Sequence, residues 1–201
     1  MLAALVTVAV IALVVFGGYT AYRSRLGPPA PGSETLRATI CDVRRGGALR
    51  LAGFGDDGED MVLEIATAAS VRQGADEWHE LTGDYRGRAV RLEWWPKPNG
   101  TKVVAYSKTT LPLAEVQVDP AALDAAKPDG PPLAALGSTF KVEESGDAIR
   151  SGALAFKTWL LYDDEKRRVL RIEKVGEEPP RACLGRVVAA DAIEVVKVGS
   201  K

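Results

Sequence analysis

The sequence predicts a mainly β protein, in which an N-terminal transmembrane helix precedes two similar small antiparallel β lobes of barrel- or sandwich-like form. Three observations support this prediction. An uncharged apolar stretch opens the chain, and short runs of β-branched and aromatic residues alternate with turn clusters after it. One strand-turn-strand pattern then occurs twice. The 201 residues, 46% hydrophobic and 26% charged, suffice for one ordinary domain or two small ones.

The apolar stretch runs from Leu2 to Tyr22 and contains no charged residue. As a helix it would be roughly 30 Å long, which matches the hydrocarbon core of a bilayer. A cleaved signal peptide is disfavoured because only Met1 precedes the stretch and no A-x-A site follows it. A buried core helix of this length would be expected to have a polar face. We therefore expect residues 1–25 to form a membrane-spanning helix.

The charges that flank this segment predict its orientation. Arg23 and Arg25 follow it directly, whereas the leading side carries only the α-amine. The positive-inside rule then places the rest of the chain in the cytoplasm, as a single-pass protein of the inner (cytoplasmic) membrane. The alternative is an extracytoplasmic β domain on the same helix. Residues 26–35 form a Pro/Gly-rich spacer of limited flexibility.

The first β lobe is expected over residues 36–118. Turn clusters occur at GFGDDGED, TGDYRG and PKPNG, and Asn99-Gly100 is a strong hairpin signal. The candidate strands are 48–52, 61–66, 77–81, 88–95, 102–107 and 114–118.

A linker is expected over residues 119–135, before a second β lobe at 136–198. Asp119 can cap a helix and Pro120 suits a first helical turn, so the linker can hold one short helix. The candidate strands of the second lobe are 139–143, 156–162, 168–175, 181–184 and 193–198.

The two lobes share a pattern in which we expect Trp78 to correspond to Trp159, and VRLE at 90–93 to LRIE at 170–173. The period of two in a strand puts the apolar residues on a buried face and the Arg and Glu residues on a solvated face. Exposed pairs of this kind contribute at most about 1 kcal/mol. The residues expected to line an apolar interior are Trp78, Leu92, Trp94, Trp159, Leu170 and Ile172.

Several strings resemble the bacterial domain-of-unknown-function 4178 family. They are DVRRGGALRLAGFGDDGEDMVLEI, EWHELTGDYRGRAVRLEWW and the LGSTFKVEESG, TWLLYDDEKRRVLRIEK and LGRVVAADAIEVV segments near the end. The resemblance covers residues 36–196, and E-W-x-E-L and R-G-R-x-V-x-L-E-W-W are its more specific parts. PKPNGTKVV departs from it, because a more acidic run is expected there. The family has no assigned activity, so the resemblance supports the β fold and leaves function open.

Residues that point to chemistry are few. His79 is the only histidine, and a solvent-facing position on a strand is the favoured interpretation. Cys41 and Cys183 are expected to be semi-buried thiols, although a bridge between them stays open. An acidic turn offers weak metal candidates but lacks the spacing of a calcium loop, so a solvated turn is favoured. We expect no cofactor. The four candidate ligands are Asp56, Asp57, Glu59 and Asp60.

The charge balance narrows the choice of partners. The net charge is −1 and no basic block occurs, which argues against nucleic acid. We expect a membrane-anchored binding or scaffold module with a protein partner in a membrane-associated complex, whose binding place is a sheet edge or a cleft between the lobes. The alternative is a membrane-tethered hydrolase, carboxylate- or metal-dependent, that uses acids such as Asp57 and Asp60 or Asp163 and Asp164.

Overall fold

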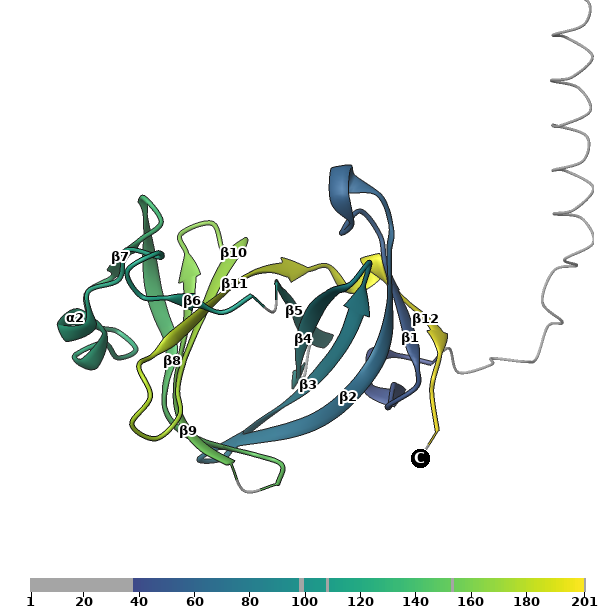
Figure 1. Cartoon of the computed structure of the whole chain (residues 1–201), viewed down its shortest axis with the longest axis horizontal. Helices are drawn as coiled ribbons and strands as arrows, with labels where there is room; N and C mark the ends of the chain where they lie inside the picture. Colours follow the sequence, from purple (N-terminus) through teal and green to yellow (C-terminus); the bar gives the residue numbers. More distant parts are fainter. Residues whose placement is uncertain (1–37, 98–99, 108, 153, 201) are drawn as a thin grey trace, which may run out of the picture. The chain divides into compact units, whose positions relative to one another are not determined.

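A computed structural model describes residues 38–97, 100–107, 109–152 and 154–200, which form a 12-stranded antiparallel sheet (Figure 1). The prediction of a mainly β, antiparallel fold is therefore confirmed. The predicted membrane segment and spacer, residues 1–35, lie outside the described residues. Within the described part of the chain, no helix has the length and apolar character needed to span a membrane.

The strands are distributed along the whole described chain, and the helical segments are short. The helix α2 (Pro120–Asp124) lies in the predicted linker, and Asp119 caps it by accepting a hydrogen bond from the Ala121 N–H group, as expected. Three 3₁₀ turns are η1 (Ile40–Asp42), η2 (Asp56–Gly58) and η3 (Ala190–Ala192). The strands are β1 (Ala48–Leu51), β2 (Met61–Gln73), β3 (Asp76–Tyr85), β4 (Arg88–Lys97), β5 (Gly100–Ser107), β6 (Leu111–Pro112), β7 (Leu133–Ala135), β8 (Ser138–Arg150), β9 (Leu154–Asp163), β10 (Arg168–Lys174), β11 (Arg181–Val188) and β12 (Ile193–Lys197).

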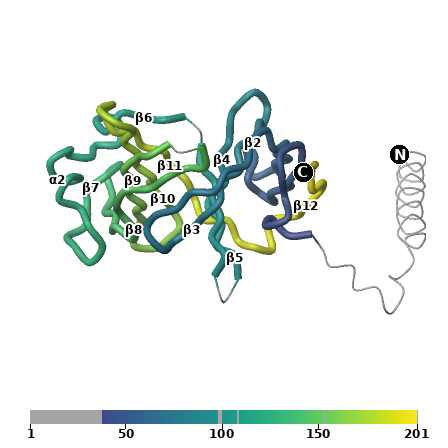
Figure 2. The backbone as a smooth tube through the Cα atoms, turned by 90° about the horizontal axis from the view of Figure 1, so that it is seen from below, coloured from purple at the N-terminus to yellow at the C-terminus, as the bar shows by residue number. Residues whose placement is uncertain are grey.

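Eight of these strands close into a ring. Neighbours follow the order β2-β3-β4-β5-β11-β10-β9-β8, and β8 returns to β2. This closing contact is short: Val71 pairs with Arg150 and Arg72 with Ile149. Figure 2 shows β2 to β5 on one side of the ring and β8 to β10 on the other. Sequence periodicity does not reveal this closure, because it depends on pairing between residues 77 to 81 positions apart in the chain.

The two sides of the ring repeat one architecture. The strand order β2-β3-β4-β5 matches β8-β9-β10-β11, and both 13-residue strands contain a register shift at the equivalent place. In β2 the shift lies between Ile65 and Thr67. In β8 it lies between Val142 and Glu144. A bulge of this kind inserts one residue and redirects the strand. Its occurrence in both halves supports an internal repeat.

The register corrects the predicted correspondence between the tryptophans. Glu93 pairs with Glu80, and its equivalent Glu173 pairs with Thr158. Trp78 therefore corresponds to Phe156, whereas Trp159 corresponds to Leu81. The predicted match is therefore three residues away from the true one, and any odd shift moves a side chain to the other face of a sheet. The two indole rings accordingly lie in different cores.

Three hydrophobic cores lie within the part of the chain that the structure describes. The first lies between β1–β5 and β12 and includes Leu92 and Trp94. The second lies under β7–β10 and α2 and includes Trp159, Leu170 and Ile172. The third, called the central core here, is inside the ring. It consists of Val71, Trp78, Trp95, Val104, Tyr106, Ala148, Phe156, Leu160, Tyr162, Val169 and Cys183.

The bulges explain how two long strands serve two cores each. In β2, Met61, Leu63 and Ile65 face the first core, yet Val71 faces the central core. An uninterrupted period of two would put all four residues on one face. The extra residue at the bulge reverses that alternation, so the strand passes from an outer core into the ring. Strand β8 does the same with Phe140 and Ala148.

The structure differs from the sequence analysis at residues 114–118, and it shows how the strands of the two predicted lobes are connected. Residues 114–117 form turns and Val118 has no regular structure, where a strand over 114–118 was predicted; the short strand β6, which pairs with β11, precedes them. The last strand, β12, pairs with β1 at the start of the described chain. Strand β11 lies between β5 and β10, so one continuous sheet runs through both predicted lobes (Figure 1).

Candidate functional site

The charged faces of β4 and β10 point into the ring and not into solvent, which corrects the predicted wet face. Glu93 and Arg171 are 0% and 1% exposed. Arg91 and Glu173 expose only 12% and 18% of their side chains. The alternation of apolar and charged residues is real, but the sheet curls so that both of its faces are buried. The sequence had suggested a purely apolar interior. The structure shows that the interior also contains these charged residues.

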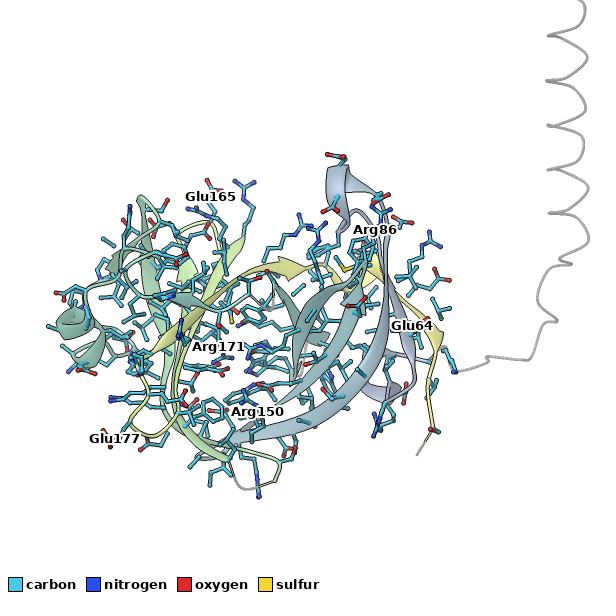
Figure 3. All side chains as sticks on the ribbon, in the orientation of Figure 1. Glu64, Arg86, Arg150, Glu165, Arg171 and Glu177 are labelled. Atoms are coloured by element: carbon cyan, nitrogen blue, oxygen red, sulfur yellow. The ribbon has the colours of Figure 1, made fainter. Side chains whose placement is uncertain are left out.

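Six charged side chains form an alternating chain across this interior. Arg150 binds Glu80 through Nε and Nη2, at 2.7 and 3.0 Å, and its Nη2 also donates to Glu173. Arg91 Nη1 donates to Glu173 Oε1 at 2.8 Å. Arg91 Nη2 lies 3.4 Å from Glu93 Oε1. Arg171 is the last member of the series, and its Nη2 lies 2.5 Å from Glu93 Oε2. Figure 3 shows Arg171 and Arg150 inside the ring of strands.

Strands β4 and β10 exchange these charges reciprocally. Arg91 of β4 pairs with Glu173 of β10, and Arg171 of β10 pairs with Glu93 of β4. Each half of the repeat thus supplies the acid that neutralises the base of the other half. The three arginines balance the three glutamates, so the interior carries no net charge from this group.

Aromatic rings enclose the more deeply buried end of this ion-pair network, at Arg171 and Glu93. The guanidinium carbon of Arg171 lies 5.0 Å from the centre of the Trp78 ring and 5.8 Å from that of Trp95. The Tyr106 hydroxyl donates to Glu93 at 3.1 Å, and Arg171 Nη1 donates to the Thr158 hydroxyl at 3.2 Å. Cation–π contacts become stronger where water is excluded. These contacts fix the Arg171–Glu93 end of the ion-pair network in one geometry.

The pKa values follow from these contacts. Burial alone would lower the pKa of Arg91 and Arg171, but the neighbouring carboxylates, Glu93 first, raise both above the usual arginine range. Burial would raise the pKa of Glu173, yet Arg91, Arg150 and Arg171 lower it below its usual value. Burial and then Glu93 raise the pKa of Tyr106 well above its usual value. Arg91, Arg171 and Glu173 are therefore ionised at neutral pH.

The three glutamates come close enough to be considered as a metal site. One carboxylate oxygen from each of Glu80, Glu93 and Glu173 lies within 4.8 Å of the others. The guanidinium groups already occupy these oxygens, and a cation would have to displace them from a buried interior. The same hydrogen bonds keep the acids from serving as a free general acid and base. The arrangement fits a structural role, in which buried ion pairs hold the two halves together.

The predicted metal candidates of the acidic turn do not form one cluster. Asp56 binds Arg88 at 2.5 Å, Glu59 binds Arg86 at 2.6 Å, and Asp60 binds Arg50 at 2.8 Å. Asp57 has a left-handed backbone with φ of 56° in the η2 turn. The Gly53 N–H group and then Arg50 lower the pKa of Asp60. These carboxylates fasten the turn to neighbouring strands.

The remaining predicted candidates are also placed by the structure. His79 stacks on Trp94 with ring centres 4.0 Å apart and is half-buried, so it is not the solvent-facing residue expected. Burial lowers its pKa. Cys41 and Cys183 are unpaired, since Cys41 packs against the first core and Cys183 lies in the central core. Asp163 binds Arg168, whereas the exposed Asp164 binds Lys141.

A surface cleft lies where the two halves meet, over β11. Its volume is about 360 Å³. The apolar lining comes from both halves and from the loop before β2: Phe54, Met61, Tyr85, Val90, Ala105 and Leu184. Arg86 and Glu165, labelled in Figure 3, mark the β3–β4 and β9–β10 turns on either side of this seam. Gly185 lies in its floor, where an added Cβ would come within 2.5 Å of the Tyr106 ring.

Three arginines line this cleft, and they differ in their partners. Arg88 is bound to Asp56, which also lines the cleft, and Arg168 is bound to Asp163. Arg186 stacks on Phe54, with the guanidinium carbon 3.8 Å from the ring centre, and donates to the Phe54 carbonyl at 3.1 Å. It has no carboxylate within ion-pair distance among residues 38–200 that the structure describes.

Comparisons with known proteins give no relative that bears on function. No family model matches the chain, and no curated protein or solved structure is similar to it. The resemblance to the domain-of-unknown-function 4178 family stays a prediction. The site must therefore be interpreted from its own geometry.

A sequence pattern could have predicted part of the interior ion-pair network, but no pattern predicted the cleft. The repeated Arg-x-Glu in VRLE and LRIE marks the same face of two equivalent strands, which is consistent with reciprocal pairing. Glu80 and Arg150 have no such repeat. Phe54 and Arg186 are 132 positions apart in the chain, so only the folded structure brings them together.

Proposed function

We propose that this protein is a membrane-tethered binding module that takes a ligand or a partner segment in the seam cleft over β11. The observation that carries the proposal is the cleft of about 360 Å³, with an apolar lining and a guanidinium group that has no acidic partner in the described chain. Concave apolar sites with a few convergent polar groups are the usual form of ligand sites.

The buried ion-pair chain supports this proposal through rigidity. It joins β3, β4, β8 and β10 across the ring, so the halves that border the cleft are held in one arrangement. A site on rigid strands binds with less loss of conformational freedom than a site on mobile loops. The hydrolase alternative gains no support, because the clustered glutamates are all bound to arginines and do not line this cleft.

The membrane tether in the proposal rests on the sequence. The uncharged stretch from Leu2 to Tyr22 has the length of a bilayer span, and Arg23 and Arg25 favour a cytoplasmic β domain. C-terminal fusions test the orientation: a cytoplasmic domain gives a fluorescent green-fluorescent-protein fusion and an inactive alkaline phosphatase fusion. The reverse pattern places the domain outside the cytoplasm.

Site-specific photo-crosslinking in cells tests the binding site. A benzophenone amino acid replaces exposed Ser107, which lines the cleft, in the full chain. The matched control carries it at exposed Glu177, in the turn after β10. We expect a covalent adduct at position 107 of the membrane fraction and none at position 177. Equal labelling at both positions, or none at position 107, contradicts a binding role for the cleft.

A further inference from the structure

The charges around the seam cleft are uneven, and they indicate what the cleft binds. Arg168 and Arg186 are directly opposite each other in the β10–β11 register. Like charges opposite each other in a sheet are destabilising. Asp163 offsets the charge of Arg168, at 3.1 Å, whereas Arg186 is paired with no acid in the described part of the chain. The position favours an anionic group beside Arg186.

The orientation of Arg186 suits a bidentate anion. Its guanidinium carbon lies over the Phe54 ring, and only Nη2 is engaged, by the Phe54 carbonyl. The remaining N–H groups of a guanidinium fork match the two oxygens of a carboxylate. Stacking on the ring fixes the fork before a ligand arrives, so less freedom is lost on binding.

The rest of the cleft limits the body of the ligand. The lining beyond Arg186 is mainly apolar, and Asp56 at another part of it is already neutralised by Arg88 at 2.5 Å. A volume of about 360 Å³ accommodates roughly ten to twelve non-hydrogen atoms if each takes about the 30 Å³ of a water molecule. A second acid on the ligand would meet no free guanidinium among the described residues that line the cleft, because Arg88 and Arg168 are already paired.

We infer that the cleft binds a linear aliphatic monocarboxylate of medium chain length, with its carboxylate on Arg186 and its chain against Met61, Val90 and Ala105. This inference rests on the proposed function of the cleft as a binding site, and adds the class of ligand. The proposed tether would attach the protein to a membrane, which is a source of acyl chains.

Equilibrium dialysis of radiolabelled octanoate tests the inference. The full chain is held in lipid nanodiscs, and nanodiscs without protein measure partition into the lipid. We expect saturable binding of one octanoate per chain and at least ten-fold weaker binding of neutral 1-octanol. R186Q is expected to weaken octanoate binding about 10- to 100-fold, since hydrogen bonds to a charged group contribute on this scale.

Two further variants separate charge from geometry. R186K keeps the charge but loses the fork, so binding weaker than wild type and tighter than R186Q is expected. R167Q removes an exposed arginine that pairs with Glu165 outside the cleft, and should bind octanoate like the wild type. An unchanged urea midpoint for R186Q shows that the variant is folded.

Several outcomes overturn the inference. They are equal octanoate binding by R186Q and wild type, equal binding of octanol and octanoate, or tighter binding of octyl phosphate than of octanoate. If octanoate does not bind but position 107 still gives its crosslink, the ligand class is wrong and the binding role of the cleft stands. If neither occurs, both proposals fail.

Discussion

Strands β4 and β10 carry the same Arg-x-Glu sequence at equivalent positions, yet the two ion pairs that they exchange differ in depth. Arg171 and Glu93 expose 1% and 0% of their side chains, whereas Arg91 and Glu173 expose 12% and 18%. The backbone repeat therefore sets the reciprocal pairing, but it does not set the environment of each pair.

The neighbouring strands explain this difference. Beside Arg91, β5 contributes Tyr106, whose hydroxyl binds Glu93; at the equivalent position beside Arg171, β11 has the smaller Cys183. Thr158 of β9 replaces Glu80 of β3 opposite the glutamate. The Tyr106 side chain covers the Arg171–Glu93 pair. Glu80 binds Arg150, which links the Arg91–Glu173 pair to the place where β8 meets β2. Divergence of the repeat thus produced one deep pair and one shallow pair.

The largest expected effect comes from breaking the deep pair. E93Q leaves the fully buried Arg171 without its carboxylate, so we expect a loss of about 3–5 kcal/mol in the free energy of unfolding. Urea unfolding of the full chain in a mild detergent, followed by tryptophan fluorescence, measures it. The combined change E93M with R171M removes both charges and should recover most of this loss. A double variant as unstable as E93Q would show that the unpaired charge is not the cause.

Breaking the shallow pair should cost less. E173Q leaves Arg150 with its bidentate contact to Glu80 and Arg91 within 3.4 Å of Glu93. We expect a loss of about 1–2 kcal/mol, because the charged hydrogen bonds from Arg91 and Arg150 are weakened without isolating a fully buried charge. The same urea experiment measures it. A loss as large as that of E93Q would contradict the difference in depth.

The pH dependence sharpens the same comparison. The pKa of Glu173 is lowered in the folded state, so its contribution to stability is present above the unfolded value near 4.5 and is lost as the pH falls through the folded value. The difference in urea midpoint between wild type and E173Q should be constant from pH 7 to about pH 5 and shrink below about pH 4. Asp42, Asp60 and Asp163, whose pKa values are also lowered, cancel in this difference. A difference that grows in acid would refute this assignment.

The smallest effect is expected at the surface. Lys141 and Asp164 form an ion pair at 2.9 Å, but their side chains are 69% and 61% exposed. D164N should change the free energy of unfolding by less than about 0.5 kcal/mol, because solvent screens such a pair. It is the matched control for E173Q, since both changes neutralise one acid of the second half. A shift comparable to that of E173Q would mean that burial does not rank these pairs.

The hydropathy pattern was correct about strands and misleading about their surroundings. Most predicted strands are present, because alternation and turn residues are local properties. Alternation alone does not distinguish a charged face in water from one turned toward charged residues of a second strand. Arg91 and Arg171 show the consequence, since the residues expected in solvent lie inside the ring. The mismatch between Trp78 and Trp159, three residues from the true equivalent Phe156, has a similar origin, because equivalence depends on register and not on residue type.

The sequence by itself determined the antiparallel β character, most strand positions, the capped helix at Pro120–Asp124 and the apolar stretch from Leu2 to Tyr22. Each is a local property of neighbouring residues. Only the tertiary structure decided that two bulged strands close a ring, that the repeated Arg and Glu residues neutralise each other inside it, and that Arg186 meets Phe54 at the seam. The physical reason is that these features depend on pairing between distant strands, whose register and curvature are fixed by packing of the whole domain.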